Sequence, residues 1–434
     1  MQRQAQPETT PPRSRQWLPD AALDAHPAGT WLLQMGFDLW IHAFYRRVVL
    51  LPEGFHIAPG TLIASNHQRD VDGPLLGTVL VHRRGLHFRW PLPFYATRED
   101  LFRAGILARL TVRWPRPLPA LLGHIPLAWF FALGHAEPMR RVREFTVGEA
   151  LHALVDAGCG GDACGVLLNP RGLRELGAAA ATPLRDVLRR ATPAVQDTCW
   201  GLRRLRLATI KRLAPAFRAT IDAQLVHFAG RLDRGRCVYF APEGSISMDG
   251  HFTRIRAGCF RLAHATRAAP WIQPMALGYD TLAAGRSRVV VRFGQPFRAD
   301  RSLDRRAFDA TLRRAILALA PVTPSHLLAR FLLHHDPRFS QADLAQWMTR
   351  SLATLRALQA SLDPLFAHAS IERLANERLR WLERKQLVVR TGGTFSVAFA
   401  RAVEPGWRTP ANSVRYLDNN LADLVPDVNR ALPC

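Results

Sequence analysis

Hydrophobic residues recur along the chain in short continuous runs, separated by stretches in which apolar and polar positions alternate with a helical period. The runs that predict buried strands are residues 61–65, 237–240, 271–277 and 289–293. Helical periodicity is present at residues 149–155 and 222–232. Because strands and helices alternate from about residue 29 to residue 300, the pattern predicts an α/β core over residues 29–300.

Residues 160–220 depart from this alternation. They contain a run of alanines, a Thr-Pro pair and an arginine-rich helical stretch from 184 to 211. We interpret them as an insertion in the core, either a basic surface hairpin or simply a solvated face. Residues 1–28, polar at their start and without an apolar core, predict a disordered tail and not a secretory signal.

The pattern after residue 300 predicts a mainly helical C-terminal module, residues 301–434. Apolar positions within 342–362 fall on one face of an amphipathic helix, and residues 371–382 predict a second helix. Residues 387–391 and 394–397 flank Gly392 and Gly393, which predicts a β-hairpin with a Gly-Gly turn. Helices followed by a hairpin favour a winged-helix-like module.

Two segments are hydrophobic enough to raise the question of a membrane. Residues 117–136 contain no Asp, Glu, Lys or Arg and are long enough to span a bilayer, but proline, glycine and histidine interrupt them. We interpret them as a buried or re-entrant segment rather than a true span. Residues 31–51 combine aromatic and aliphatic side chains with Arg46 and Arg47 near their end, which predicts either a helix in the membrane interface or a helix packed on the core.

The chain is strongly basic, with a net charge of +23 at pH 7 that is almost entirely arginine, since Lys211 and Lys385 are the only lysines. A biased composition alone explains such an excess as well as function does. Physically, the excess attracts anions such as lipid head groups, acidic carrier proteins or nucleic acid. Each basic side chain near an anionic leaflet contributes about 1 kcal/mol to binding.

The run from Asn66 to Pro74 places a histidine and a carboxylate where a predicted strand gives way to a turn. A histidine with a near-neutral pKa can take a hydroxyl proton as the oxygen attacks a carbonyl group. A carboxylate partner holds the ring in one tautomer and stabilises the imidazolium. Asp72 follows His67 by five positions, and Asp70 is a rival partner by proximity. The bland alternative is that His67 ends a strand and Asp72 caps the next helix.

A second run, from Tyr239 to Ser245, contains the sequence Pro242-Glu243-Gly244. Glycine lets the backbone approach a ligand closely. A carboxylate beside it can accept a hydrogen bond from a ligand hydroxyl or position an arginine that binds phosphate.

Together and in this order, the two runs resemble the glycerophospholipid acyltransferase family, which uses a His-x4-Asp motif for catalysis and a Phe-Pro-Glu-Gly motif to hold a glycerol phosphate acceptor. The resemblance covers roughly residues 60–300 and implies a mixed sheet flanked by helices. It implies His67 as the base, Asp72 as its orienting carboxylate, and Glu243 and Gly244 as acceptor-binding residues.

Arginines complete the acceptor site that the resemblance implies. Arg141, with Arg140 close behind, lies where the family carries an acceptor-phosphate arginine. Ile246 stands where the family has another arginine, and Arg254 or Arg256 could compensate; we assign Arg256. The segment from Pro270 to Asp280 is similar to the family's fourth block, and its Gly-Tyr-Asp ending is closer to the glycerol-3-phosphate branch than to the lysophosphatidate branch.

The expected activity is transfer of a fatty acyl group from acyl-coenzyme A or acyl-carrier protein to a glycerophosphate hydroxyl in phospholipid synthesis. The resemblance implies no metal and no bound cofactor. The expected partners are the acyl donor, the glycerophosphate acceptor and an anionic membrane surface. The expected location is the cytoplasmic side of the membrane, as a peripheral or monotopic protein.

Two other functions stay open. The charge of +23 and the predicted C-terminal hairpin also fit a basic nucleic-acid-binding protein with a winged-helix-like module. The basic residues are spread along the chain and not concentrated in one recognition helix, so we do not expect nucleic acid as a partner. Ile246 raises the third possibility, a family member that binds lipid but has lost catalysis.

Overall fold

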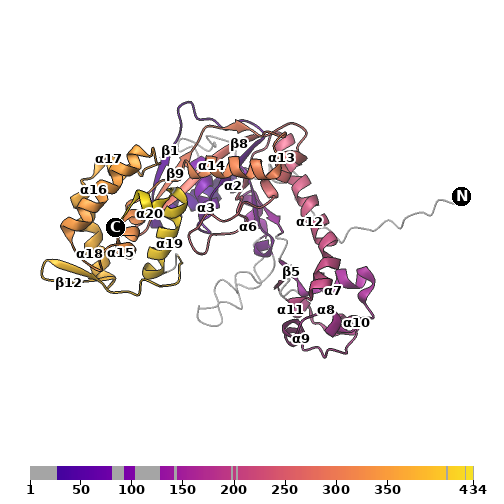
Figure 1. The fold of residues 1–434 in the computed structure, drawn as a ribbon. Coiled ribbons are helices and arrows are strands. Elements are labelled where there is room, and N and C mark those ends of the chain that lie inside the picture. Colours follow the sequence, from indigo (N-terminus) through magenta and orange to yellow (C-terminus); the bar gives the residue numbers. More distant parts are fainter. Residues whose placement is uncertain are drawn as a thin grey trace.

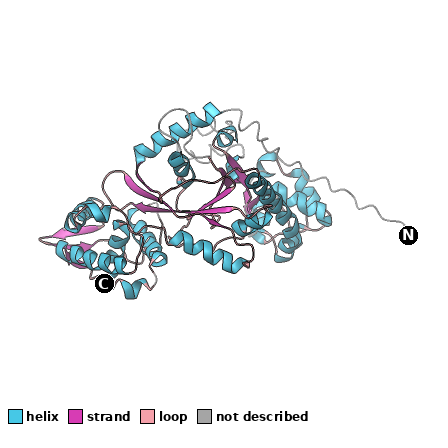
Figure 2. Cartoon of the chain, turned by 90° about the horizontal axis from the view of Figure 1, so that it is seen from above, coloured by secondary structure: helices cyan, strands magenta, loops and turns pink. Residues whose placement is uncertain are grey.

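The computed structural model describes residues 27–80, 92–102, 128–140, 144–196, 199–201, 204–406, 409–425 and 427–433. A mixed, mostly parallel β-sheet lies at its centre, with helices on both faces (Figures 1 and 2). The α/β class predicted from the hydrophobic pattern is therefore confirmed.

The central sheet has the strand order β1-β9-β8-β2-β7-β3-β4, with β10 paired to β8. Neighbouring strands run parallel except that β8 pairs antiparallel with β9 and β10. The four predicted strands are β2, β7, β8 and β9, whereas β1, β3, β4 and β10 were not predicted. In chain order the strands are β1 (Tyr45–Leu50), β2 (Thr61–Ser65), β3 (Phe94–Arg98), β4 (Ala136–Met139), β7 (Val238–Phe240), β8 (Trp271–Asp280), β9 (Ser287–Phe293) and β10 (Phe297–Arg298).

Strand β2 shows how the sheet is covered on both faces. Leu62 and Ala64 pack with helices α12 (Leu207–Asp233), α13 (Gly258–Ala265) and α14 (Arg305–Leu317). Ile63 points the other way and packs with α2 (Pro27–Phe44) and α3 (Asp72–Leu80). A parallel strand buried on both faces reads as a continuous apolar run, which is why this strand could be predicted.

The predicted helix at 31–51 is wrong at its C-terminal end. Helix α2 begins at Pro27 and ends at Phe44, and Tyr45–Leu50 forms β1, which pairs in parallel with β9. The β-branched Val48 and Val49 favour this strand, and pairing with an existing sheet edge decides the outcome. Residues 1–26 of the predicted tail lie outside the described residues.

The predicted re-entrant segment at 117–136 is described only from residue 128, where α6 (Ala128–Leu133) precedes β4. The short 3₁₀ helix η1 (Glu99–Phe102) precedes the undescribed stretch. Among the helices that the structure describes, none combines the length and the apolar character needed to cross a bilayer.

The predicted insertion is a small lobe with its own hydrophobic core, which includes Phe145, Trp200 and Phe217 (Figure 1, lower right). It is not a hairpin, and the predicted helix from 184 to 211 is interrupted at Ala191 and by strand β6. The first half of α12 belongs to the lobe and its second half packs on the sheet. Its other elements are β5 (Glu144–Thr146), α7 (Val147–Leu154), η2 (Val155–Cys159), α8 (Cys164–Leu167), α9 (Pro170–Leu176), α10 (Leu184–Arg190), α11 (Pro193–Gln196) and β6 (Cys199–Gly201).

The C-terminal part has a separate core, but α14 packs on the central sheet through Phe308, Leu312 and Ile316 although it follows residue 300. The predicted helices and hairpin are α16, α18 and β12–β13, while α15, α19 and β11 were not predicted. Asp280 at the end of β8 accepts a hydrogen bond of 2.6 Å from Arg378 of α18 and joins the two parts. The elements are α15 (Pro324–His334), β11 (Arg338–Ser340), α16 (Gln341–Ala357), α17 (Leu365–His368), α18 (Ile371–Arg384), β12 (Val388–Thr391), β13 (Thr394–Val397), α19 (Pro410–Leu424) and α20 (Val428–Ala431).

Candidate active site

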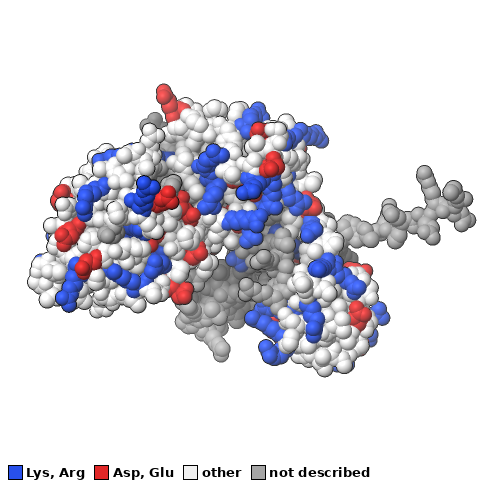
Figure 3. All heavy atoms as spheres, in the orientation of Figure 1, with Lys and Arg blue, Asp and Glu red and all other residues white. Residues whose placement is uncertain are grey.

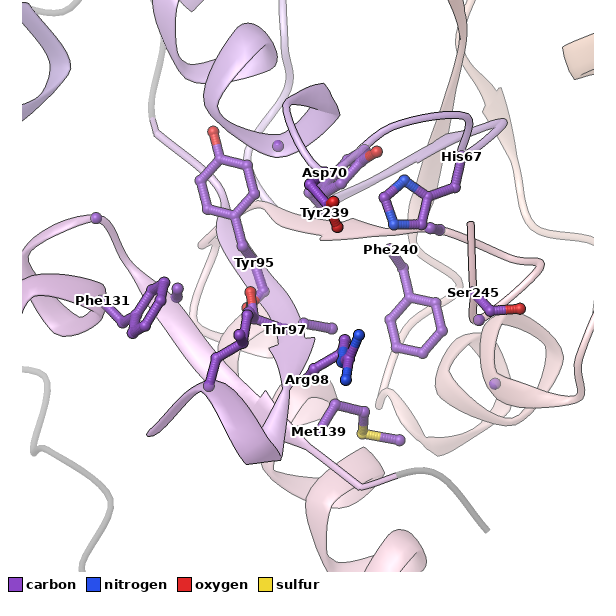
Figure 4. Close-up of a pocket in the computed structure, with 18 of the residues that line it drawn as sticks. His67, Asp70, Tyr95, Thr97, Arg98, Phe131, Met139, Tyr239, Phe240 and Ser245 are labelled. Atoms are coloured by element: carbon purple, nitrogen blue, oxygen red, sulfur yellow. The ribbon is translucent and has the colours of Figure 1, made fainter. Parts of the chain in front are cut away.

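The parallel strands β2, β7, β3 and β4 are neighbours, so their carboxyl ends meet at one edge of the sheet. This edge is where α/β proteins place their ligands. A cavity of about 720 Å³ lies there (Figure 4). Its wall includes His67 after β2, Gly244 after β7, Arg98 at the end of β3 and Arg140 after β4.

His67 and Asp72 form the predicted pair. Nδ1 of His67 lies 3.0 Å from Oδ2 of Asp72, whose side chain is fully buried at the first residue of α3. The same Oδ2 accepts the backbone N–H groups of Gln68 and Arg69, at 2.7 Å and 2.9 Å. Because an ionised carboxylate only accepts, Nδ1 carries the ring hydrogen and Nε2 is left as the proton acceptor.

Asp70 does not replace Asp72 as the partner of the histidine. Its side chain is exposed and lines the cavity, while the buried Asp72 occupies the Nδ1 side of the ring. The N–H of Asp72 donates to the carbonyl of Arg69 at 3.1 Å, and this turn carries the second carboxylate back beneath the ring.

Tyr279 near the end of β8 supports the pair, and the sequence reasoning gave it no role. Its hydroxyl donates to Oδ1 of Asp72. Burial, followed by the charge of Asp72, raises the pKa of Tyr279 well above its usual value, so the phenol keeps its proton. The signal was available, because Tyr279 belongs to the Gly-Tyr-Asp block of the strand that pairs with β2.

An acceptor-binding side chain would line the cavity, and the side chain of Glu243 does not. It is buried and lies outside the cavity wall, and both of its carboxylate oxygens accept from protein donors. Oε2 accepts the backbone N–H of His67 at 2.9 Å, and Oε1 accepts the backbone N–H of Thr253 at 2.8 Å. We therefore correct its predicted role: Glu243 joins the two motif loops and does not line the cavity. Burial raises the pKa of its carboxyl group.

Gly244 and Arg256 do line the cavity. Gly244 has φ +68°, and a Cβ atom added there would lie 3.2 Å from Cγ of Arg256. Nε of Arg256 lies 3.4 Å from the carbonyl oxygen of Glu243. Within the described part of the chain Arg256 has no acidic partner, so its guanidinium can bind an anion. Arg254 is not part of the cavity wall, so of these two arginines Arg256 is the one that lines the cavity.

Arg141 lies outside the described residues. The neighbouring Arg140 lines the cavity, but its Nε lies 2.8 Å from Glu99 and its Nη2 lies 2.7 Å from Glu149. Arg98 also points its guanidinium into the cavity (Figure 4). The sequence reasoning missed Arg98 because it did not recognise residues 94–98 as a strand, whose carboxyl end reaches the site.

One side of the cavity is apolar. Leu33 and Phe37 of α2 line it together with Phe130 and Phe131 of α6. The rings of Phe37 and Phe130 meet edge to face at 5.9 Å. The cavity thus combines an imidazole, arginines and a hydrocarbon wall.

Helix α19, which precedes the short α20, contacts the loops that follow β2 and β7 through Asn420. Its Oδ1 accepts from Nε2 of His326 at 2.9 Å and lies 3.5 Å from Nε2 of Gln68, the residue after the candidate base. Its Nδ2 donates to the carbonyl of Gly250 at 2.9 Å. A Cβ atom on Gly250 would lie 1.9 Å from the carbonyl oxygen of Tyr416, so only glycine permits this approach.

The described residues contain no group of three or more His, Cys, Asp or Glu side chains arranged to hold a metal ion. A comparison with protein-family models gives no match, and a comparison with curated proteins gives none either.

Proposed function

We propose that this protein is an O-acyltransferase of phospholipid synthesis, which moves a fatty acyl group from coenzyme A or acyl-carrier protein to a glycerophosphate hydroxyl. One observation carries the proposal. A buried carboxylate fixes Nδ1 of His67, and the ring lines a cavity that also contains Arg256 and an apolar wall. Base, anion site and hydrocarbon wall are what acyl transfer to a phosphorylated alcohol requires.

The chemistry needs no protein nucleophile. Nε2 of His67 takes the proton of the acceptor hydroxyl while its oxygen forms a bond to the thioester carbonyl carbon. The tetrahedral intermediate then expels the sulfur, and the imidazolium returns the proton to the leaving thiolate. Asp72 stabilises the imidazolium, and the Tyr279 hydroxyl holds Asp72 in place. A base in this position contributes about 10²–10⁴-fold to the rate.

Arg256 and Arg98 are our candidates for the acceptor phosphate, since guanidinium groups bind phosphate in a bidentate manner. Arg256 supplies the charge that Ile246 does not, which favours an active enzyme over a degenerate relative. Figure 3 shows basic side chains gathered over the face that carries α13 and α14. Such a face would attract a coenzyme A phosphate or an acidic carrier protein.

The membrane is the proposed partner of helix α2. Four of its apolar side chains are well exposed, namely those of Leu32 (63%), Leu39 (75%), Trp40 (44%) and Phe44 (58%). The same helix lines the cavity through Leu33 and Phe37. A helix with this exposed face suits the cytoplasmic interface of a bilayer, as in a peripheral or monotopic protein. Flotation with anionic vesicles tests this interpretation. Replacing both Leu39 and Trp40 by Glu should abolish flotation, and unchanged flotation of that variant would reject membrane binding through α2.

Nucleic-acid binding receives little support from the C-terminal module. Its elements run from α15 and β11 through α16, α17 and α18 to the β12–β13 hairpin, and the winged-helix-like module stays a prediction. The helix before the hairpin is α18, and its exposed side chains carry balanced charge, with no positive excess for phosphates. These side chains are Glu372, Arg373, Glu377, Arg380, Glu383 and Arg384.

The test is an acyl-transfer assay of the purified chain with palmitoyl-coenzyme A, and separately with palmitoyl acyl-carrier protein, using glycerol-3-phosphate and lysophosphatidate as acceptors. His67→Ala should lower kcat by about 10²–10⁴-fold. His56→Ala is the matched control, because His56 is exposed and lies outside the cavity wall. Full turnover by His67→Ala, or tight DNA binding without transfer to either acceptor, would overturn the proposal.

A further inference from the structure

The cavity contains a carboxylate that the proposed chemistry does not use. Asp70 lies three positions after His67, and Figure 4 shows both side chains directed into the cavity. The Asp70 side chain is exposed to the cavity, and within the described ranges no donor or cation contacts its carboxylate. Asp72, by contrast, accepts hydrogen bonds on both of its oxygens.

An unpartnered carboxylate is out of place in a site for an anion. The charged side chains around it on the cavity wall are Arg98, Arg140, Arg256 and Arg261. A negative charge among them weakens the binding of a phosphate by repulsion. It is an asset only toward a ligand group that is cationic or donates a hydrogen bond, and the proposed acceptors contain no cationic group.

The position of Asp70 indicates which group of the ligand donates this hydrogen bond. The acceptor hydroxyl must lie at the His67 ring, and the Asp70 carboxylate lines the same cavity on the turn that follows. A group held by Asp70 therefore belongs to the same small portion of the acceptor as the reacting hydroxyl. The next hydroxyl along a polyol chain satisfies this requirement.

We propose that Asp70 accepts a hydrogen bond from a second hydroxyl of the acceptor, adjacent to the one that His67 deprotonates. This inference rests on the proposed acyltransferase function and refines it. The acceptor is then a polyol phosphate with two free neighbouring hydroxyls, such as glycerol-3-phosphate. Lysophosphatidate has only one free hydroxyl and leaves Asp70 unpaired.

The experiment combines substitutions of Asp70 with acceptors that have or lack the second hydroxyl. Values of kcat/KM are measured for glycerol-3-phosphate, for lysophosphatidate, and for 1,3-propanediol phosphate, which keeps a terminal hydroxyl but lacks the middle one. The enzymes are the wild type, Asp70→Ala, Asp70→Asn and the control Asp156→Ala. Asp156 is an exposed carboxylate of the lobe outside the cavity wall. Thermal unfolding verifies that each variant is folded.

In the wild type, glycerol-3-phosphate should be preferred over the diol phosphate by about 10–100-fold, the range for a hydrogen bond to a charged group. Asp70→Ala should lose that factor with glycerol-3-phosphate and stay within about twofold with the diol phosphate. Asp70→Asn keeps one acceptor oxygen and should fall between, while Asp156→Ala should match the wild type.

Three outcomes would overturn the inference. An equal loss with both acceptors would make Asp70 a general structural or electrostatic residue. A gain with both acceptors would show that Asp70 only repels phosphate. A wild-type preference for lysophosphatidate that Asp70→Ala leaves unchanged would exclude the second hydroxyl. Failure of the underlying function looks different, because the wild type would then transfer to no acceptor.

Discussion

Replacing His326 by glutamine should remove a large part of the acid sensitivity of this fold. The ring is buried where α15 meets α19, and its Nδ1 accepts the backbone N–H of Thr323 at 2.9 Å. Its Nε2 donates to Asn420. The Nδ1 contact requires the neutral imidazole, because a protonated ring would present a second donor to the Thr323 N–H. The Nε2 contact does not, since Nε2–H donates in either protonation state.

The size of this pH effect on stability follows from the pKa of His326. Burial lowers the pKa of His326 from 6.5 to about 4, although Asn420 and the charges of Asp280 and Asp418 oppose the change. Between these values the unfolded chain binds a proton that the folded chain does not, so stability falls as the pH falls from 6.5 toward 4. The full change in the pKa corresponds to about 3 kcal/mol in the free energy of unfolding, of which about 2 kcal/mol is lost by about pH 5.

The assay is urea unfolding of the wild type and His326→Gln at several pH values between about 5 and 7.5, with exposed His56→Gln as the control. The quantity compared is the change in the free energy of unfolding across this range, since other groups titrate equally in all three proteins. His326→Gln should show a drop smaller by about 2 kcal/mol, and the control should follow the wild type. Parallel curves for wild type and His326→Gln would refute the reasoning.

Three further changes test the edge of the sheet that carries the candidate site. Tyr279→Phe removes the donor to Asp72 and should lower kcat about tenfold with little change in KM, measured by steady-state transfer; an unchanged kcat would exclude the supporting role. Glu243→Gln turns an amide N–H₂ toward a backbone N–H and should cost about 1–3 kcal/mol in urea unfolding, and a neutral result would contradict the bonding described. Gly244→Ala should cost about 1–2 kcal/mol and raise KM for the phosphate acceptor several-fold, whereas Gly177→Ala, with φ +61° and open space, should show only the stability loss.

The sheet was predictable where strands are buried on both faces. Residues 62–64 form a continuous apolar run because helices cover both sides of β2, and Val289–Val291 form a second run whose three side chains are fully buried. Strand β1 was mistaken for helix because Arg46 and Arg47 interrupt its apolar run, and only pairing with β9 stabilises the extended form. Long-range pairing of this kind leaves no local pattern.

The site was predictable in part for a similar reason. His67 and Asp72 are close in sequence, so their spacing alone placed them together. The contact of Glu243 with the His67 backbone N–H spans 176 residues, and no spacing rule distinguishes it from a ligand contact. The same holds for Tyr279 and Asn420, whose roles follow only from the order of strands and the docking of α19.

The hydrogen bond between Asn420 and Gln68 also affects when the site can form during synthesis of the chain. The two residues are 352 positions apart, so at a synthesis rate of about 5–20 residues per second the loop of His67 emerges on the order of tens of seconds before Asn420. A nascent chain on the ribosome therefore carries the complete motif but an unfinished site. The loop that follows His67 gains this contact only after α19 has been synthesised and has folded back onto the first half of the protein.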